Sequence, residues 1–155
     1  MNSRTIFKTT LLGVALAFAA TSASADNIRL RFHTYYGTEM DAIAKKMQDM
    51  VREESDGSMR IQYFRGGELV DSDQFVEATA GGTIDVAYGV GSYWPGQVDI
   101  ANIEAGLPGA WTSADEAREV FEQLNPILEE AYEEKGVKLI GRGFGSNYDL
   151  LTKEP

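Results

Sequence analysis

The chain alternates between two hydrophobic periods, and this alternation limits its fold more than any other feature. Residues 28–35 (IRLRFHTY) place apolar side chains at every second position, which is the period of a strand with one covered face. Between the strand-like stretches, apolar residues recur at helical spacing over 40–51 and 75–80. This order predicts an α/β fold with a mostly parallel sheet flanked by helices on both faces. The expected strands are residues 28–35, 59–64, 84–90, 137–144 and 148–152.

Capping and turn residues predict where the first two helices begin and end. Thr38 is the expected N-cap of the first helix, and the pair Asp56–Gly57 is expected to end it. Residues 66–69 predict a turn. Asp71 and Ser72 are the expected caps of the short second helix.

The stretch after the third strand has a different texture. Residues 91–111 are rich in glycine, proline and aromatics without a sustained period, so they predict an ordered loop region. Ser113 and Glu116 form a capping-box pattern that predicts a helix. The pair Asn125–Pro126 predicts the start of a separate helix, with proline at its first position, and the pair Lys135–Gly136 is expected to end it.

The amino-terminal segment has the pattern of a secretory signal peptide. Arg4 and Lys8 form a basic region, residues 11–20 form a short apolar core, and small residues precede Asp26. We expect residues 1–25 to be cleaved and the protein to be released into the periplasm. The segment is shorter than the roughly 20 apolar residues of a membrane span. No later stretch is apolar enough to be inserted in a membrane, so we expect no direct membrane insertion.

Charge and composition exclude several classes of partner and scaffold. The 155 residues carry a net charge of −10. The predicted signal holds two basic residues and no acids, so the remaining chain has 12 basic and 24 acidic residues, a net charge of −12. Such a chain repels phosphate backbones and anionic lipids, and we expect no nucleic-acid partner. The absence of cysteine excludes a disulfide scaffold, and 43% hydrophobic residues are typical of a globular protein.

Residues with catalytic or metal-binding potential are few. His33 is the single histidine, so a zinc site has little support and a surface or strand-end position is expected instead. Asp71 and Asp73 could bind a metal, but helix capping explains them more simply. Residues 141–146 (GRGFGS) have a serine at the third glycine position of the dinucleotide fingerprint and no helix pattern after it. We therefore predict no catalytic residues, no metal site and no cofactor.

The expected binding region is the edge where the strands end. Parallel α/β sheets bind ligands beyond the carboxyl ends of their strands. Aromatic and small polar residues follow several of these ends and favour a small-molecule cleft, although aromatics could instead complete the rim of the core. These residues are Thr34, Tyr35, Tyr36, Tyr88, Ser92, Tyr93, Trp94, Gly145, Ser146, Asn147 and Tyr148.

A series of short motifs occurs along the chain in a fixed order. Ser55–Gly57 ends a helix, Gly67–Leu69 follows a strand, Gly82–Asp85 precedes the next strand, and Gly106–Pro108 comes later. This order resembles the extracytoplasmic solute-binding subunit of tripartite ATP-independent periplasmic (TRAP) transporters. The similarity spans residues 28–155.

The resemblance implies a protein roughly twice as long, with two α/β lobes that close on a ligand like a hinge. In the family, a segment like YDLLTKEP precedes a D-L-K-G-x-K-x-R stretch whose arginine grips the ligand carboxylate. We therefore expect residues 26–145 to be the first lobe and 146–155 the start of the crossing into a missing second lobe. A chain without that arginine is expected to bind organic acids poorly. Asp149 stands where some relatives have a second arginine. This acid either disfavours a strongly anionic, doubly anchored ligand or has its side chain directed away from the ligand.

The resemblance also implies particular ligand contacts. Tyr35, the pair Asp71 and Ser72, and residues 90–93 match positions that contact ligand in the family. Together with the residues at the sheet edge, the candidate ligand-binding residues are Tyr35, Asp71, Ser72, Tyr88, Val90, Gly91, Ser92, Tyr93, Trp94, Asn147 and Tyr148.

The resemblance implies a periplasmic receptor that captures a small organic acid. It would deliver this carboxylate to the small and large integral membrane subunits of a transporter driven by an ion gradient. The alternative is a ligand-sensing or scaffold module of the same fold without a transport role. An exported hydrolase is disfavoured, because no catalytic constellation can be assembled around one histidine.

Overall fold

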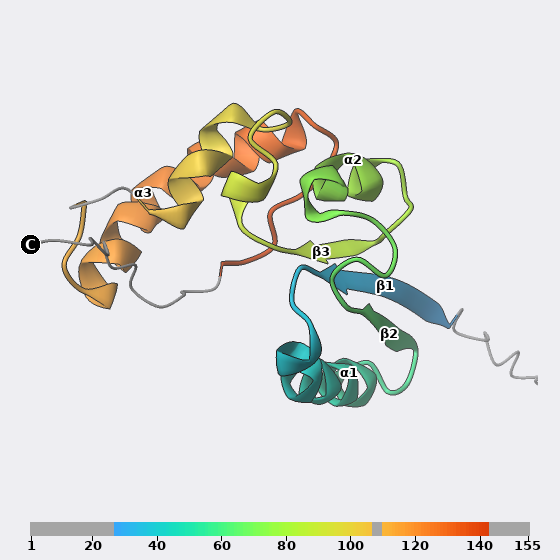
Figure 1. Cartoon of the computed structure of the whole chain (residues 1–155). Coiled ribbons are helices and arrows are strands. Elements are labelled where there is room, and N and C mark those ends of the chain that lie inside the picture. Colours follow the sequence, from blue (N-terminus) through green and yellow to red (C-terminus); the bar gives the residue numbers. More distant parts are fainter. Residues whose placement is uncertain (1–26, 107–109, 143–155) are drawn as a thin grey trace, which may run out of the picture.

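The computed structural model describes residues 27–106 and 110–142, which contain a three-stranded parallel sheet. Its strands are β1 (Ile28–Thr34), β2 (Met59–Phe64) and β3 (Val86–Tyr88), in the order β2-β1-β3 (Figure 1). Ile28 lies opposite Met59 and Phe32 lies opposite Val86, and both pairings are parallel. The predicted α/β class and parallel sheet are confirmed.

Two helices cover opposite faces of this sheet. α1 (Asp41–Glu54) packs mainly against β2, and α2 (Phe75–Ala80) lies on the other side, beside β3 (Figure 1). Ala44 faces the sheet and is buried, whereas Ile43 and Met50 remain exposed on the outer side of α1. These helices complete two strand–helix–strand units, which bring the carboxyl ends of all three strands to one edge.

The entry into both helices differs from the prediction. Thr38 is not a helix cap, because it begins the 3₁₀ turn η1 (Thr38–Met40) that leads into α1. The carboxylate of Glu39 accepts a hydrogen bond from the backbone N–H of Gly37 at 3.0 Å. Asp71 does precede the 3₁₀ turn η2 (Ser72–Gln74), but its side chain makes no capping hydrogen bond.

The third strand is shorter than residues 84–90. Ile84 is fully buried, and Asp85 accepts hydrogen bonds from the backbone and side chain of Arg31. Only Val86–Tyr88 continue beside β1 as a ladder. The apolar run therefore contributes one core side chain before the strand itself begins.

The region 91–111 is more regular than an ordered loop. It contains two 3₁₀ helices, η3 (Gly91–Tyr93) and η4 (Asp99–Ala105). Val98 and Ala101 are both buried, and this spacing of three residues places them on one side of a 3₁₀ helix. One apolar pair three residues apart is too short a signal to predict this helix from the sequence.

The two helices predicted after residue 112 form one helix, α3 (Ala114–Glu133), with Pro126 inside it. Phe121, Leu128 and Tyr132 are buried on a single stripe that continues past the proline. Proline removes the bond to the carbonyl of Glu122, but both residues lie on the exposed side, where water can bind that carbonyl. Burial of the continuous stripe therefore outweighs the break that proline predicts.

Both ends of α3 follow the prediction. The Ser113 hydroxyl accepts a hydrogen bond from the backbone N–H of Glu116, whose carboxylate accepts one from the backbone N–H of Thr112. At the other end Gly136 adopts a φ of 78°, and the Val137 N–H bonds to the Tyr132 carbonyl. Such a left-handed residue is the common way to end a helix.

The predicted fourth strand is not formed by residues 137–142, the part of it that the structure describes. Val137 and Leu139 pack against the core while Ile140 is exposed, so the alternation is real. An alternating segment becomes a strand only if its backbone pairs with another strand, and these residues have no such partner among the described ones. The predicted fifth strand and the lobe-crossing segment lie outside the described residues.

The main hydrophobic cluster joins α2, the 94–101 region and the end of α3. Its members include Phe75, Ile84, Trp94, Val98 and Tyr132. Within residues 27–106 and 110–142, no helix has the length and apolar character needed to cross a bilayer. The predicted signal segment, residues 1–25, lies outside the described residues.

Candidate functional site

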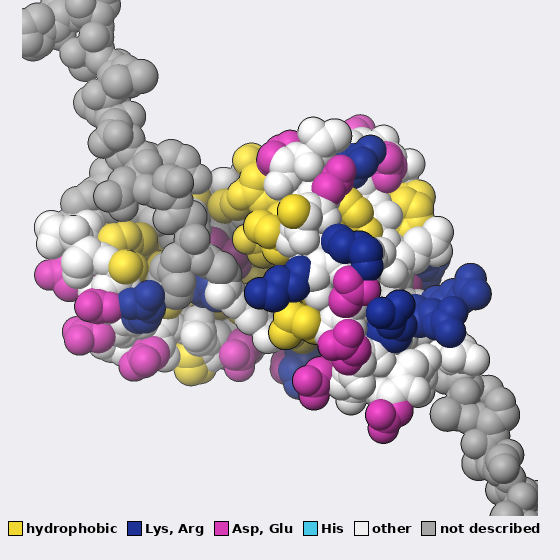
Figure 2. Space-filling view, turned by 90° about the horizontal axis from the view of Figure 1, so that it is seen from below, with side chains coloured by type: hydrophobic (Ala, Val, Ile, Leu, Met, Phe, Trp, Pro, Cys, Tyr) yellow, Lys and Arg dark blue, Asp and Glu magenta, His cyan; other side chains and the backbone are white. Residues whose placement is uncertain are grey.

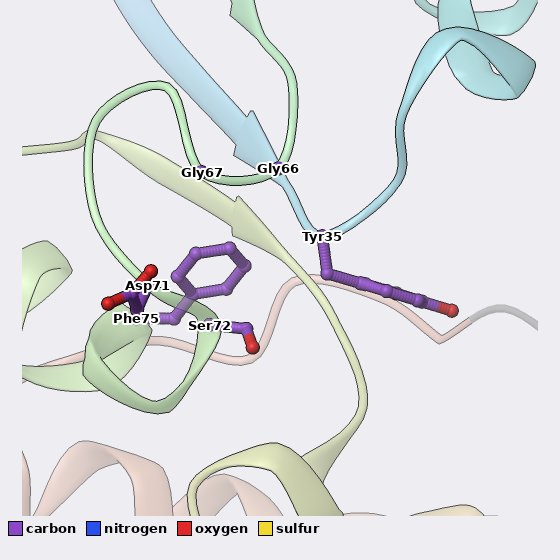
Figure 3. A pocket seen from close by; sticks show the side chains of 6 residues that line it. All are labelled: Tyr35, Gly66, Gly67, Asp71, Ser72 and Phe75. Atoms are coloured by element: carbon purple, nitrogen blue, oxygen red, sulfur yellow. The ribbon is translucent and has the colours of Figure 1, made fainter.

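A small pocket lies at the carboxyl edge of the sheet. Its volume is about 140 Å³. Figure 3 shows the ring of Phe75 pointing from α2 toward the turn after β2, with Tyr35 at the end of β1 on the other side. The residues that line the pocket are Tyr35, Gly66, Gly67, Asp71, Ser72 and Phe75. Three of the predicted ligand contacts, Tyr35, Asp71 and Ser72, are thus brought together.

The turn after β2 lies directly against the end of β1. The Gly66 N–H donates to the Tyr36 carbonyl at 2.8 Å. A Cβ atom at Gly66 would lie 2.6 Å from the Tyr35 carbonyl oxygen, which no side chain can tolerate without movement. Glycine at this position therefore allows the close approach that forms one wall of the pocket.

A cluster of four tyrosines extends from the pocket along the same edge. The ring of Tyr35 stacks on Tyr36 at 4.1 Å between centroids, and Tyr93 meets Tyr35 edge-on at 4.9 Å. Tyr88 stacks beside both Tyr35 and Tyr36, at 6.4 and 6.1 Å. Tyr88 and Tyr93 are among the exposed hydrophobic residues, so their rings are accessible.

Burial raises the pKa of two of these phenols above the ordinary value of tyrosine. It raises the pKa of Tyr35, and the neighbouring Tyr36, Tyr93 and Tyr88 raise it further. The pKa of Tyr88 is raised by burial and by Tyr36. Neutral phenols offer a solute both hydroxyl donors and flat apolar faces.

The other predicted contacts lie in different surroundings. Trp94 is buried in the core, and its indole N–H donates to the Tyr132 hydroxyl at 3.0 Å. Gly91 is buried against Ala101, whereas Ser92 is exposed and Val90 is partly buried. None of these four lines the pocket. Asn147 and Tyr148 lie outside the described residues.

The described residues also contain a buried ion pair. An oxygen of Glu104 is 3.8 Å from Nη1 of Arg142, and their side chains are only 9% and 13% exposed. The guanidinium of Arg142 also covers the ring of Phe121 at 4.2 Å. Burial raises the pKa of Glu104, although Tyr132 and Arg142 act in the opposite direction. This pair joins η4, α3 and the segment after α3.

His33 lies one residue before the end of β1, which agrees with the predicted strand-end position, but it is fully buried and not on the surface. Its Nε2 accepts hydrogen bonds from the backbone N–H groups of Leu69 and Val70 at 3.2 and 3.4 Å. The alternation of β1 placed it on the polar face, and that face is covered near the end of the strand. The burial of His33 depends on the path of the turn that contains Leu69 and Val70, which comes more than 30 residues later in the chain.

The pocket-lining residues that the prediction missed are Gly66, Gly67 and Phe75. The two glycines directly follow β2, so the rule that strand ends share an edge could have found them. The helical spacing over 75–80 predicts Phe75 as a helix residue, and its position at the start of α2 brings it to the same edge.

The described residues offer no sign of a metal centre. In ranges 27–106 and 110–142, no three His, Cys, Asp or Glu side chains come together in a way that could hold an ion.

Over the face seen in Figure 2, Lys and Arg side chains are interspersed with Asp and Glu, so the surface carries both signs of charge. A second, shallower hollow of about 300 Å³ lies between α2 and the 96–97 turn and contains none of the predicted contacts.

A parallel α/β lobe with a pocket at its carboxyl edge has the architecture of a protein that binds a small molecule. Residues 36–149 match the family described as bacterial extracellular solute-binding protein, family 7, and the chain belongs to this family. The proteins of this family are solute-binding proteins and not enzymes. A TRAP transporter solute binding protein from Bordetella bronchiseptica shares the fold with a TM-score of 0.61 at 23% identity, over 70% of this chain and 34% of that protein. Together with the family match, it confirms the resemblance to TRAP solute-binding subunits.

Two characterised relatives are similar over 90% of this chain. The 2,3-diketo-L-gulonate-binding periplasmic protein YiaO of Escherichia coli is 21% identical over 141 residues, which cover 43% of that protein. The ectoine-binding periplasmic protein TeaA of Halomonas elongata is 27% identical over 147 residues, which cover 41% of it. The chain thus spans about two fifths of the length of these relatives.

A solved structure shares the fold. The extracytoplasmic solute receptor of Bordetella pertussis that binds pyroglutamic acid superposes with a TM-score of 0.63 at 14% identity. The match covers 72% of this chain and 38% of the receptor. The described residues therefore have the fold of one part of such a receptor.

Proposed function

We propose that this protein is a periplasmic solute-binding protein that captures a small organic acid for a TRAP transporter. The pocket formed by Tyr35, Gly66, Gly67, Asp71, Ser72 and Phe75 supports the proposal, because it lies at the carboxyl edge of a parallel α/β sheet, where such sheets bind ligands. The partners in transport would be the small and large membrane subunits. The signal segment at residues 1–25 would direct the protein to the periplasm.

The chemistry of this edge favours a small, partly apolar acid. Relatives bind 2,3-diketo-L-gulonate, ectoine and pyroglutamic acid, which are all small polar molecules. The tyrosine cluster supplies flat surfaces and hydroxyl donors, and Ser72 supplies a further hydroxyl. The described pocket is lined by no lysine or arginine, so a carboxylate would find its cationic partner elsewhere.

NMR titration of the ¹⁵N-labelled chain tests this proposal, because it detects weak binding. The probes are pyroglutamate, 2,3-diketo-L-gulonate and ectoine, each added separately. We expect one of them to shift the amide signals of Gly66, Gly67 and Ser72. Ser72→Ala should weaken that binding, whereas the control Ser58→Ala, at the opposite edge of the sheet, should not. Shifts confined to other regions, or no shift with any probe, would contradict the assignment of this pocket.

A further inference from the structure

His33 connects the end of β1 to the turn that lines the pocket. Its Nε2 lies 3.2 Å from the backbone nitrogen of Leu69 and 3.4 Å from that of Val70. Its Nδ1 lies 3.0 Å from the carbonyl oxygen of Thr34. Two N–H donors require an unprotonated acceptor, and a carbonyl requires a donor. The ring is therefore neutral, with its proton on Nδ1.

The surroundings of the ring are almost entirely uncharged. In the sheet His33 lies between Phe64 of β2 and Ala87 of β3. From α2 the ring of Phe75 meets it edge-on, with 4.9 Å between centroids. From the turn, Glu68 is the titratable group whose charge acts on it. Burial lowers the pKa of His33 below its usual 6.5, opposed by the Thr34 carbonyl and by Glu68.

The turn that His33 holds is part of the pocket. Gly66 and Gly67 line the pocket at the start of this turn, and Asp71 and Ser72 line it just after the turn ends. Gly66 is bonded to Tyr36 at one end, so the two bonds to His33 hold the other end. Without these two hydrogen bonds, the end of the turn at Leu69 and Val70 would no longer be bonded to β1.

We propose that His33 is a positioning residue of the binding pocket: its neutral ring holds the turn from Gly66 to Val70 in the shape that receives the solute, and protonation of the ring releases that turn. This inference deepens the proposed function and rests on it for the effect on solute binding. The effect on the turn can be measured without any solute.

The direction of the pH effect follows from the geometry. A proton added to Nε2 would point an N–H at two N–H donors, and both hydrogen bonds would be lost. The folded state therefore favours the neutral ring, and the turn is fully held above about pH 6.5, the ordinary pKa of histidine. This support is lost as the pH falls through the lowered pKa of His33.

The single histidine makes a direct test possible on the full chain. Nitrogen NMR of ¹⁵N-histidine-labelled protein at about pH 7.5 should show Nδ1 protonated and Nε2 bare. On acidification, one titration below about pH 6.5 should coincide with a loss of protection from hydrogen exchange at Leu69 and Val70, measured relative to the slower intrinsic exchange in acid. An Nε2–H tautomer, or a titration that leaves these two amides unchanged, overturns the proposal.

Variants separate the acceptor from the shape of the ring. His33→Phe keeps a ring but removes the acceptor, and should raise exchange at Leu69 and Val70 by about tenfold or more while abolishing the pH step. His33→Asn retains an acceptor and should lie between this variant and the native chain. The control Tyr63→Phe, which removes a 3.5 Å contact to Gly37, should leave both amides unchanged.

A titration with pyroglutamate completes the test. If pyroglutamate binds the native chain, its affinity should fall by about tenfold between about pH 7.5 and pH 5, and His33→Phe should bind weakly at both. Equal affinity of the native chain at both pH values overturns the effect on solute. If none of the three probes binds while the tautomer and exchange results hold, the positioning role stands and the proposed function fails.

Discussion

Gly91→Ala tests whether the contact between η3 and η4 is as close as the structure shows. Gly91 is buried, and an added Cβ would lie 2.6 Å from the Cβ of Ala101 and 2.7 Å from its carbonyl carbon, with the carbonyl oxygen closer still. Real Cβ atoms do not approach other atoms to this distance, so backbone must move. Gly91 does not have a positive φ, so the cost comes from the contact and not from strain in the turn.

The magnitude follows from the cost of overpacking. Inserting a methyl group into a well-packed interior costs about 1–3 kcal/mol, and we expect the upper end because part of the obstacle is backbone. For a chain of this size, 3 kcal/mol lowers Tm by roughly 6–12 °C. Urea denaturation followed by circular dichroism measures the free energy of unfolding.

Two further variants isolate the cause. Gly96→Ala is the matched control, because a Cβ there has no atom within 4 Å, and it should be neutral or stabilise by up to about 1 kcal/mol. Ala101→Gly in the Gly91→Ala background removes the methyl but not the carbonyl, so it should recover only part of the loss. A loss below about 0.5 kcal/mol for Gly91→Ala, equal to that of the control, would refute the close contact.

The remaining predictions concern one cap and two carboxylates. Ser113→Ala should lower the free energy of unfolding by about 1 kcal/mol, because it removes the acceptor for the Glu116 N–H. Ser113→Asp offers a new acceptor and should restore most of that loss. An unchanged urea midpoint for Ser113→Ala would contradict this role of the cap. Asp85→Asn should lower the free energy of unfolding at neutral pH, because the bond to Arg31 lowers the pKa of Asp85. The difference in this free energy between the variant and the native chain should vanish as the pH falls below about 3.8. A difference that persists in acid would exclude this ionic cause. Burial raises the pKa of Glu104, so ionising this carboxyl costs more in the folded chain than in the unfolded one. As the pH rises above about 4.5, the native chain should therefore lose free energy of unfolding relative to Glu104→Gln. A gain over that range would show that the attraction of Arg142 outweighs the burial.

Local patterns determined most of the first half of the fold. The alternation in β1 and β2 and the glycines after α1 and α3 depend only on neighbours in the chain, and the structure confirms them. The capping box at Ser113 is likewise set by residues three positions apart. Because strands joined by helices pair in parallel, the common edge and its pocket follow from this order as well.

Features that depend on distant contacts could be decided only by the tertiary structure. α3 continues through Pro126 because the residues after the proline have buried positions to fill: Leu128 is fully buried, and Tyr132 packs in the cluster with Phe75 and Trp94, far away in the sequence. His33 is buried because a turn that begins more than 30 residues later covers it. Neither outcome is visible in a local window.

Tyr35 and Trp94 show the same division within the candidate site. Both are aromatic residues that follow a strand, so the sequence assigns both to the ligand edge. In the folded chain Trp94 finds the Tyr132 hydroxyl for its indole N–H and can therefore be buried in the core. Tyr35 is held at the edge, where Gly66 packs against its backbone. The sequence by itself determined which edge carries aromatic side chains, and only packing across the whole lobe decided which of them face the pocket, because burial of a polar ring depends on a partner that no local pattern specifies.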